Sequence, residues 1–226
     1  NFAQIGKPTD KDRWGMTPAT SDAQYNPLTN DITFPAGILQ PPAFYLDAID
    51  PVNYGAIGVV IGHEISHGFD DQGAQYDAQG RLNNWWTKDD YAKFQARVSC
   101  VANQFENYVI EPGIHHNGKL VLGESIADLA GAKIAYTALQ IAMKKNPAQT
   151  LDGFTPEQQF FIAWGQFRGD ATRPETMRTM VQGDPHPIAK FRVIGPLSNL
   201  PVFAAAFGCK ADSAMVRPPA QRCEVW

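Results

Sequence analysis

This chain of 226 residues has little of several features that define whole classes of protein. No apolar run approaches the length of about 18 residues that a membrane-spanning helix needs. There is no basic excess, because the net charge is -4 and the pI is near 5.7. We therefore expect neither a membrane span nor a nucleic-acid partner for this chain. Internal repeats and low-complexity tracts are also missing, and 44% hydrophobic content predicts one core in a helical lobe.

Histidine is scarce, yet two of the five histidines lie four residues apart in His63-Glu-Ile-Ser-His67. The apolar run 54–62 before them predicts a buried helix. Positions four apart on a helix differ by only about 40° around its axis, so both imidazoles can reach one metal ion. Glu64 is about 100° from His63 and can approach that ion without binding it. This is the place of a general base in metal-assisted hydrolysis.

The alternative is a helix whose polar residues simply face solvent. It fits poorly, because Ile57, Val59, Val60 and Ile61 place apolar groups around the helix. Buried histidines need partners. The pattern therefore predicts a metal site.

A catalytic zinc usually has three protein ligands and one open position. A longer motif with a third histidine is excluded, because Asp70 and Gly73 occupy its glycine and histidine positions. The best remaining candidate is Glu124, which opens a predicted long helix over 123–145, with Asp128 four residues later on the same face. One carboxylate can bind the metal while the other accepts a ligand histidine's N–H. Taken alone, the pair is better explained as a carboxylate favoured by the helix dipole plus a solvated Asp.

Several segments together resemble the neprilysin family of zinc metallopeptidases, which includes neprilysin, endothelin-converting enzyme and bacterial PepO. The resemblance is collinear over nearly the whole chain. It rests on Val60–Asp71, Gly123-Glu-x-x-Ala-Asp128, the terminal Cys223-Glu-Val-Trp226, Phe34–Pro42 and Asp184–Val193.

The resemblance implies one zinc ion per chain, bound by His63, His67 and Glu124. It implies that Glu64 takes a proton from the attacking water and that Asp128 orients a ligand histidine. The implied fold is mainly α with a small β component, a thermolysin-like gluzincin lobe. The implied activity is endopeptidase cleavage of small peptides. Two alternatives stay open: a zinc hydrolase acting on a non-peptide substrate, and an inactive relative that serves as a binding module.

Two further roles depend on the resemblance. His186 would stabilise the oxyanion, and Arg192 would hold a substrate carbonyl. Without the resemblance, a lone histidine in Gly183-Asp-Pro-His-Pro187 is typical of a loop, and Arg192 is typical of a solvated or paired cation.

The substrate-binding strand departs from the family. Asp22 and Ala23 begin Asp22-Ala-Gln-Tyr25, where the family has Asn-Ala-x-Tyr. An ionised Asp can only accept hydrogen bonds, so we expect weaker hydrogen bonding to the substrate backbone than in the family.

The resemblance also implies an apolar pocket wall formed by Val59, Val60 and Phe167. Ala43 stands where an aromatic residue is common, which predicts a roomy pocket.

Family members are much longer, so residues 1–226 are expected to be the C-terminal catalytic portion of a larger enzyme. Its helical N-terminal portion would be absent from this chain. The start at Asn1 without an initiator Met supports a fragment.

Three cysteines are an odd number. The resemblance implies that Cys100 pairs with Cys223 and that Cys209 pairs with a cysteine in the missing portion. Disulfides indicate the periplasm or the exterior, and three reduced thiols in a cytosolic enzyme are the alternative. The lack of an Asn-x-Ser/Thr sequence favours a bacterial source, and a membrane anchor in the missing portion stays open.

Local signals predict a short strand at 31–34 and another at 119–122. Helices are expected at 87–108, 155–167 and 199–207. The loop at 111–118 predicts exposed histidines at His115 and His116.

Overall fold

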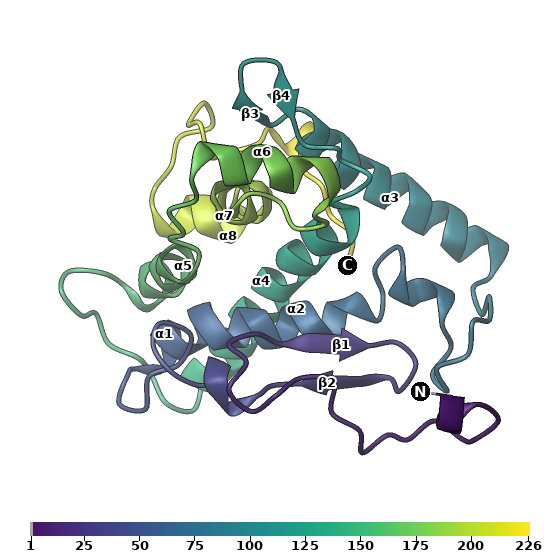
Figure 1. The fold of residues 1–226 in the computed structure, drawn as a ribbon. Helices are drawn as coiled ribbons and strands as arrows, with labels where there is room; N and C mark the ends of the chain where they lie inside the picture. The colour runs from purple at the N-terminus through teal and green to yellow at the C-terminus, as the bar shows by residue number, and fades with distance from the viewer. Residues whose placement is uncertain (1) are drawn as a thin grey trace.

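Helices are the main regular elements of the computed structural model, which describes residues 2–226 (Figure 1). The helices are α1 (Asp50–Asn53), α2 (Val59–His67), α3 (Lys88–Glu106), α4 (Leu122–Met143), α5 (Pro156–Phe167), α6 (Pro174–Gly183), α7 (Ala189–Leu197) and α8 (Pro201–Ala206). None of these helices is long and apolar enough to cross a membrane.

The β component consists of two short antiparallel pairs. β1 (Gln24–Asn26) pairs with β2 (Asp31–Thr33), and β3 (Val109–Glu111) pairs with β4 (Ile114–His115). The β1–β2 pair lies alongside α2 (Figure 1), and β1 contacts that helix. The prediction of a mainly helical fold with a small β component is confirmed.

The centre of the fold is the contact between α2 and α4, the most extensive between any two elements. A π-helical turn, Tyr54–Gly58, leads into α2. The two helices approach closely at Gly62 and Gly131. A Cβ at Gly62 would lie 2.9 Å from the Gly131 Cα, and a Cβ at Gly131 would lie 2.7 Å from the backbone nitrogen of His63. Glycine at both positions therefore lets His63 sit directly beside the first turns of α4.

The burial of α2 is only partly as predicted. Val59 and Val60 are buried, but Ile61 is 39% exposed. Ile65 and Phe69 follow at intervals of four and are also exposed. Residues four apart lie on the same face of a helix, so these three side chains form one partly exposed apolar face along α2 and the turn after it.

Local capping explains where two helices begin. Thr87 accepts a hydrogen bond from the Asp90 N–H at the start of α3, and Thr155 and Gln158 form a capping box before α5. Both starts were predicted. The strand predicted at 119–122 is wrong, because the Asn117 side chain accepts the N–H groups of Lys119 and Leu120 and folds this segment into a turn.

The prediction for the histidine loop is half right. His115 is exposed, but His116 is only 2% exposed. Its Nε2 accepts the N–H of Ile188, 3.3 Å away, and its ring contacts Phe105 and Phe191. Tertiary packing that the loop sequence does not display therefore buries this side chain.

The C-terminal segment is fixed to the helices. Cys223 forms a disulfide with Cys100 of α3 across a sequence separation of 123, while Cys209 is a free, partly exposed thiol. The ring of Trp226 stacks on Phe94 at 5.5 Å. Closing so long a loop removes much of the freedom of the unfolded chain.

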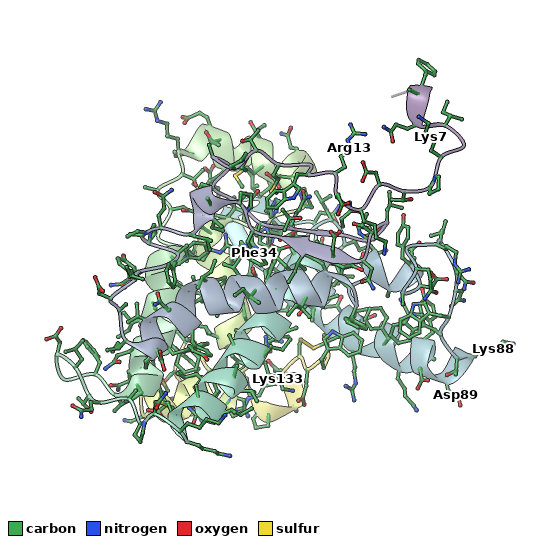
Figure 2. All side chains as sticks on the ribbon, turned by 90° about the horizontal axis from the view of Figure 1, so that it is seen from below. Lys7, Arg13, Phe34, Lys88, Asp89 and Lys133 are labelled. Atoms are coloured by element: carbon green, nitrogen blue, oxygen red, sulfur yellow. A yellow bond between two sulfur atoms is a disulfide. The ribbon has the colours of Figure 1, made fainter. Side chains whose placement is uncertain are left out.

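The first twenty residues contribute little to this body. Apart from Asn1, which lies outside the described residues, they are mostly exposed. Figure 2 shows Lys7 and Arg13 on a segment that extends away from the helices.

Candidate metal centre and cleft

Three side chains from α2 and α4 present ligand atoms to one point. His63 Nε2 lies 3.0 Å from His67 Nε2 and 3.3 Å from a Glu124 carboxylate oxygen. His67 Nε2 lies 3.5 Å from the other oxygen of Glu124. Ligands on a tetrahedral zinc with bonds of about 2.0–2.1 Å are about 3.3 Å apart. The His-His-Glu donor set and its spacing therefore fit zinc, with one position left open.

His63 is oriented from α4. Its Nδ1 lies 2.9 Å from an oxygen of Asp128, which is fully buried. Arg192 of α7 holds that carboxylate with two hydrogen bonds of 2.7 and 2.8 Å, and donates a third, 3.0 Å long, to Glu124. A carboxylate behind a ligand histidine fixes its tautomer and leaves the other nitrogen for the metal.

The charges in this cluster are strongly coupled. Burial disfavours a charged His63, but its contacts with Asp128 and Glu124 outweigh this and raise the pKa to about 9. Burial also opposes an ionised Glu124, yet the interaction with His63 lowers the pKa of that carboxyl to about 2. Burial disfavours an ionised Asp128 as well, but Arg192 and His63 outweigh this and hold the pKa of its carboxyl well below the usual range. Both carboxylates are therefore ionised at neutral pH, and His63 must release a proton when a metal binds.

His67 has its own carboxylate partner, Asp70, which was not among the predicted site residues. Their Nδ1 and Oδ2 atoms are 2.7 Å apart, and Asp70 is only 4% exposed. The other oxygen of Asp70 accepts the N–H groups of Gln72 and Gly73. A carboxylate three residues after a ligand histidine is the signal that could have identified it.

Glu64 is buried at the edge of the cluster, 5% exposed. Burial raises the pKa of its carboxyl, and Glu124 and Asp22 add to the effect while His63 and His67 oppose it. A carboxylate with a raised pKa is a better proton acceptor, as a general base requires.

His186 reaches the cluster from the loop between α6 and α7. Its Nε2 lies 3.4 Å from Glu124, and its Nδ1 lies 2.7 Å from Asp184. Its side chain is 47% exposed. Asp184 was quoted only as part of a motif, and the structure shows that it contacts the imidazole.

Most of these residues line one cleft of about 550 Å³, although Asp128 and Asp184 do not. It includes the three candidate ligands, Glu64, His186 and Arg192, together with the predicted substrate residues Asp22, Ala23, Val60 and Phe167. Ala43 lines it as well, whereas Val59 is fully buried and does not. Val59 was therefore wrongly placed on the pocket wall, because it points into the core instead.

Asp22 and Ala23 lie immediately before β1, which begins at Gln24. The Asp22 carboxylate accepts the Ala23 N–H at 3.0 Å, and its side chain is exposed. In the described part of the chain β1 pairs only with β2, so one edge of the strand is open.

Comparison with known families finds that residues 22–223 match the model of peptidase family M13. The chain is 44% identical over 229 residues to an endothelin-converting enzyme homolog of Locusta migratoria, covering all of this chain and 31% of that protein. It is 43% identical over 227 residues to human endothelin-converting enzyme 1, covering 99% of this chain and 29% of that one.

The chain is also similar to solved structures of longer proteins. The Mycobacterium tuberculosis zinc metalloprotease Zmp1, in complex with an inhibitor, superposes with a TM-score of 0.95 at 43% identity, over 99% of this chain and 35% of that one. PepO from Lactobacillus rhamnosis superposes with a TM-score of 0.89 at 38% identity, over 99% and 34%. The chain thus spans about a third of the length of the proteins it matches.

Proposed function

Because this chain belongs to peptidase family M13, we propose that it is the zinc-binding, catalytic C-terminal portion of a longer endopeptidase that cleaves small peptides. The observation that carries the proposal is the triangle of His63, His67 and Glu124 with Glu64 beside it in one cleft. His63, His67 and Glu124 would hold one zinc ion per chain.

Zinc bound there would supply Lewis-acid chemistry, polarising a carbonyl and making water more acidic. Glu64 would accept the proton of the attacking water and later deliver it to the leaving amine. Its buried position and raised carboxyl pKa support this role. Asp128 and Asp70 would hold the two histidines in the tautomer that leaves Nε2 free.

His186 and Arg192 are proposed as donors to substrate oxygen atoms. Asp184 at 2.7 Å from Nδ1 would orient His186, so that its Nε2 donates to the oxyanion formed by attack on the carbonyl. Arg192 uses three of its five N–H groups on Asp128 and Glu124, which leaves two for a substrate carbonyl.

Substrate would run along the open edge of β1 as an added strand, with Ala23 contributing backbone hydrogen bonds. Val60 and Phe167 would contact the side chain that follows the scissile bond. Asp22 can only accept hydrogen bonds, so we expect Asp22→Asn to raise kcat/KM on neutral peptides about tenfold. Steady-state assays of both proteins on one neutral peptide check this, and an unchanged kcat/KM would remove Asp22 from the substrate site.

The disulfide between Cys100 and Cys223 supports an oxidising compartment, which we propose is the periplasm or the exterior of a bacterium. The free thiol of Cys209 would pair with a cysteine elsewhere in the longer protein. Peptide mapping of that protein under non-reducing conditions tests both pairings, and a link between Cys209 and Cys100 would contradict them.

The function is tested by metal analysis and peptide digestion of the protein and of its Glu64→Gln variant. We expect one zinc in each and loss of nearly all hydrolysis in Glu64→Gln, since only the proton acceptor has changed. His67→Ala is the matched comparison and should lose zinc as well. Normal turnover by Glu64→Gln would refute the mechanism. Zinc without cleavage of any peptide would favour a different hydrolase or an inactive binding module.

A further inference from the structure

Arg168 is a buried cation on the wall of the cleft that the chemistry above does not use. It follows directly after α5, and its side chain is 19% exposed. The guanidinium carbon lies 5.0 Å from the ring centre of Trp164 and 5.1 Å from that of Phe167. Contact with two aromatic rings positions the group without neutralising its charge.

Two of the three carboxylates that act on Arg168 are already occupied, and the third, Asp170, is exposed. Both oxygens of Asp128 receive hydrogen bonds from Arg192, and one oxygen of Glu124 does too. The closest approach of Arg168 to Asp128 is 3.9 Å, beyond hydrogen-bond distance. Among residues 2–226 the Arg168 Nε is buried and has no hydrogen-bond partner.

The side chain is nonetheless charged. Burial, helped by repulsion from Arg192, lowers the pKa of Arg168 to about 10, which is still far above neutral pH. No group of the described residues pairs closely with this cation, so the guanidinium that lines the cleft is available to a charged ligand.

A purely structural role accounts for less of what is observed. The positive charge does lie at the C-terminal end of α5, where the helix dipole favours it. An exposed lysine or arginine would achieve the same effect. It would not need a guanidinium that contacts two aromatic rings and lines the cleft.

We infer that Arg168 binds a carboxylate of the peptide substrate, next to the apolar wall of Val60 and Phe167. The inference rests on the proposed peptidase function. A glutamate side chain fits the arrangement, because its methylene groups can pack on the apolar wall while its carboxylate accepts two parallel hydrogen bonds from the guanidinium. The C-terminal carboxylate of a short peptide offers the same chemistry.

The rest of the cleft makes this preference specific to one position. Asp22 is an exposed carboxylate whose charge acts on Glu64, so an acidic substrate group on that side would be repelled. Arg168 is acted on by Arg192 and by the carboxylates of Asp128, Glu124 and Asp170. Arg192 already holds the first two of these carboxylates, so an acidic substrate group is best placed where it meets Arg168, away from Asp22.

The test measures binding by titration calorimetry, with the Glu64→Gln substitution present throughout so that no peptide is consumed. Peptides come in pairs with Glu or Gln at one position, moved stepwise past the cleavage site, each with a free or an amidated C-terminus. We expect one position at which Glu binds about tenfold tighter than Gln, as for a desolvated charge pair. Arg168→Met should reduce that ratio to about one, and Arg168→Lys should leave an intermediate ratio because it keeps charge without the planar fork.

Arg173→Met is the matched control, since Arg173 is an exposed arginine five positions later that does not line the cleft. It should keep the full Glu preference. Tighter binding of peptides with a free rather than an amidated C-terminus, lost in Arg168→Met, would identify the terminal carboxylate as the ligand. That result would support the inference equally. The same ratio in Arg168→Met, or no preference at any position in the protein that retains Arg168, overturns it.

Two readouts separate the possible failures. Zinc content and circular dichroism show whether each variant folds. If Arg168→Met does not fold, the inference is tested by the ratio of Glu-peptide to Gln-peptide affinity in the parent protein and in Arg168→Lys. Wild-type protein that cleaves neutral and acidic peptides equally contradicts only the role of Arg168. Failure to bind or cleave any peptide overturns the proposed function as well.

Discussion

The two histidines of the candidate zinc site are supported in different ways. Asp128 reaches His63 from a separate helix and is itself held by Arg192 from a third. Asp70 reaches His67 from the loop directly after α2 and is held by two backbone N–H groups. One support therefore depends on how α2, α4 and α7 pack, whereas the other depends on a local turn.

This difference separates metal affinity from fold stability. Asp128 lies in a network of buried charges, so its loss would leave other charges unpaired. Asp70 makes its hydrogen bonds to a histidine and to its own loop, so its loss should affect the metal more than the fold. We therefore expect substitutions of the two carboxylates to change the unfolding free energy by different amounts. Both substitutions should lower the zinc affinity.

The largest effect is expected for Asp128→Ala. Removing this carboxylate leaves Arg192 and His63 buried without their partner, which should cost about 3–5 kcal/mol of unfolding free energy. Zinc affinity should fall roughly 10–100-fold, because His63 is no longer oriented. Urea unfolding of metal-free protein and competition titration with a chelator measure the two quantities.

Asp128→Asn is the control for this change, since it keeps the volume and one acceptor while removing the charge. It should destabilise the protein less than Asp128→Ala. Equal unfolding free energies for wild type and Asp128→Ala would show that the buried network does not hold the helices together.

A smaller effect is expected for Asp70→Asn. The amide oxygen can still accept the N–H groups of Gln72 and Gly73, so the unfolding free energy should change by less than about 1 kcal/mol. Zinc affinity should nevertheless fall about tenfold, because a neutral amide orients His67 less strongly. Destabilisation as large as that of Asp128→Ala would erase the distinction between local and tertiary support.

His116 provides the contrasting case of a histidine buried without a carboxylate. Burial lowers its pKa to about 4, below the ordinary value of about 6.5. The unfolded chain therefore binds more protons between these values, and the stability from this residue is complete above about pH 6.5 and is lost as pH falls toward 4. We expect roughly 1–3 kcal/mol of this pH dependence to disappear in His116→Val.

The measurement is the unfolding free energy of both proteins from pH 4 to 7. Only their difference matters, because other groups titrate in the same range. Parallel curves would show that His116 does not titrate between the folded and unfolded states as its burial implies.

The sequence allowed the local features to be predicted and left the tertiary ones open. The His63–His67 spacing and the helix starts expected at 87 and 155 depend on a few neighbouring residues, and all three appear in the structure. The pairing of His63 with α4 requires the close approach of Gly62 and Gly131, which no local pattern displays. From the residues alone, Glu124 was therefore no better than a dipole-favoured carboxylate.

The wrong predictions also concern features that depend on tertiary contacts or on local patterns that were not recognised. The turn formed by Asn117 replaced a predicted strand, and packing against Phe105 and Phe191 buried a histidine expected on the surface. Helices α6 and α7 were not predicted, and Pro196 inside α7 obscures the helical pattern of that segment. Arg168 lies beside the cleft only because of how α5 packs against the helices around it.

The central claim is that α2 and α4 together form one zinc site. Anomalous scattering measured on either side of the zinc absorption edge, from a crystal of the zinc-loaded protein, tests it most directly. We expect one peak at about 2.0–2.2 Å from His63 Nε2, His67 Nε2 and a Glu124 oxygen. A peak bound by other residues, or none at these three side chains, would contradict the claim.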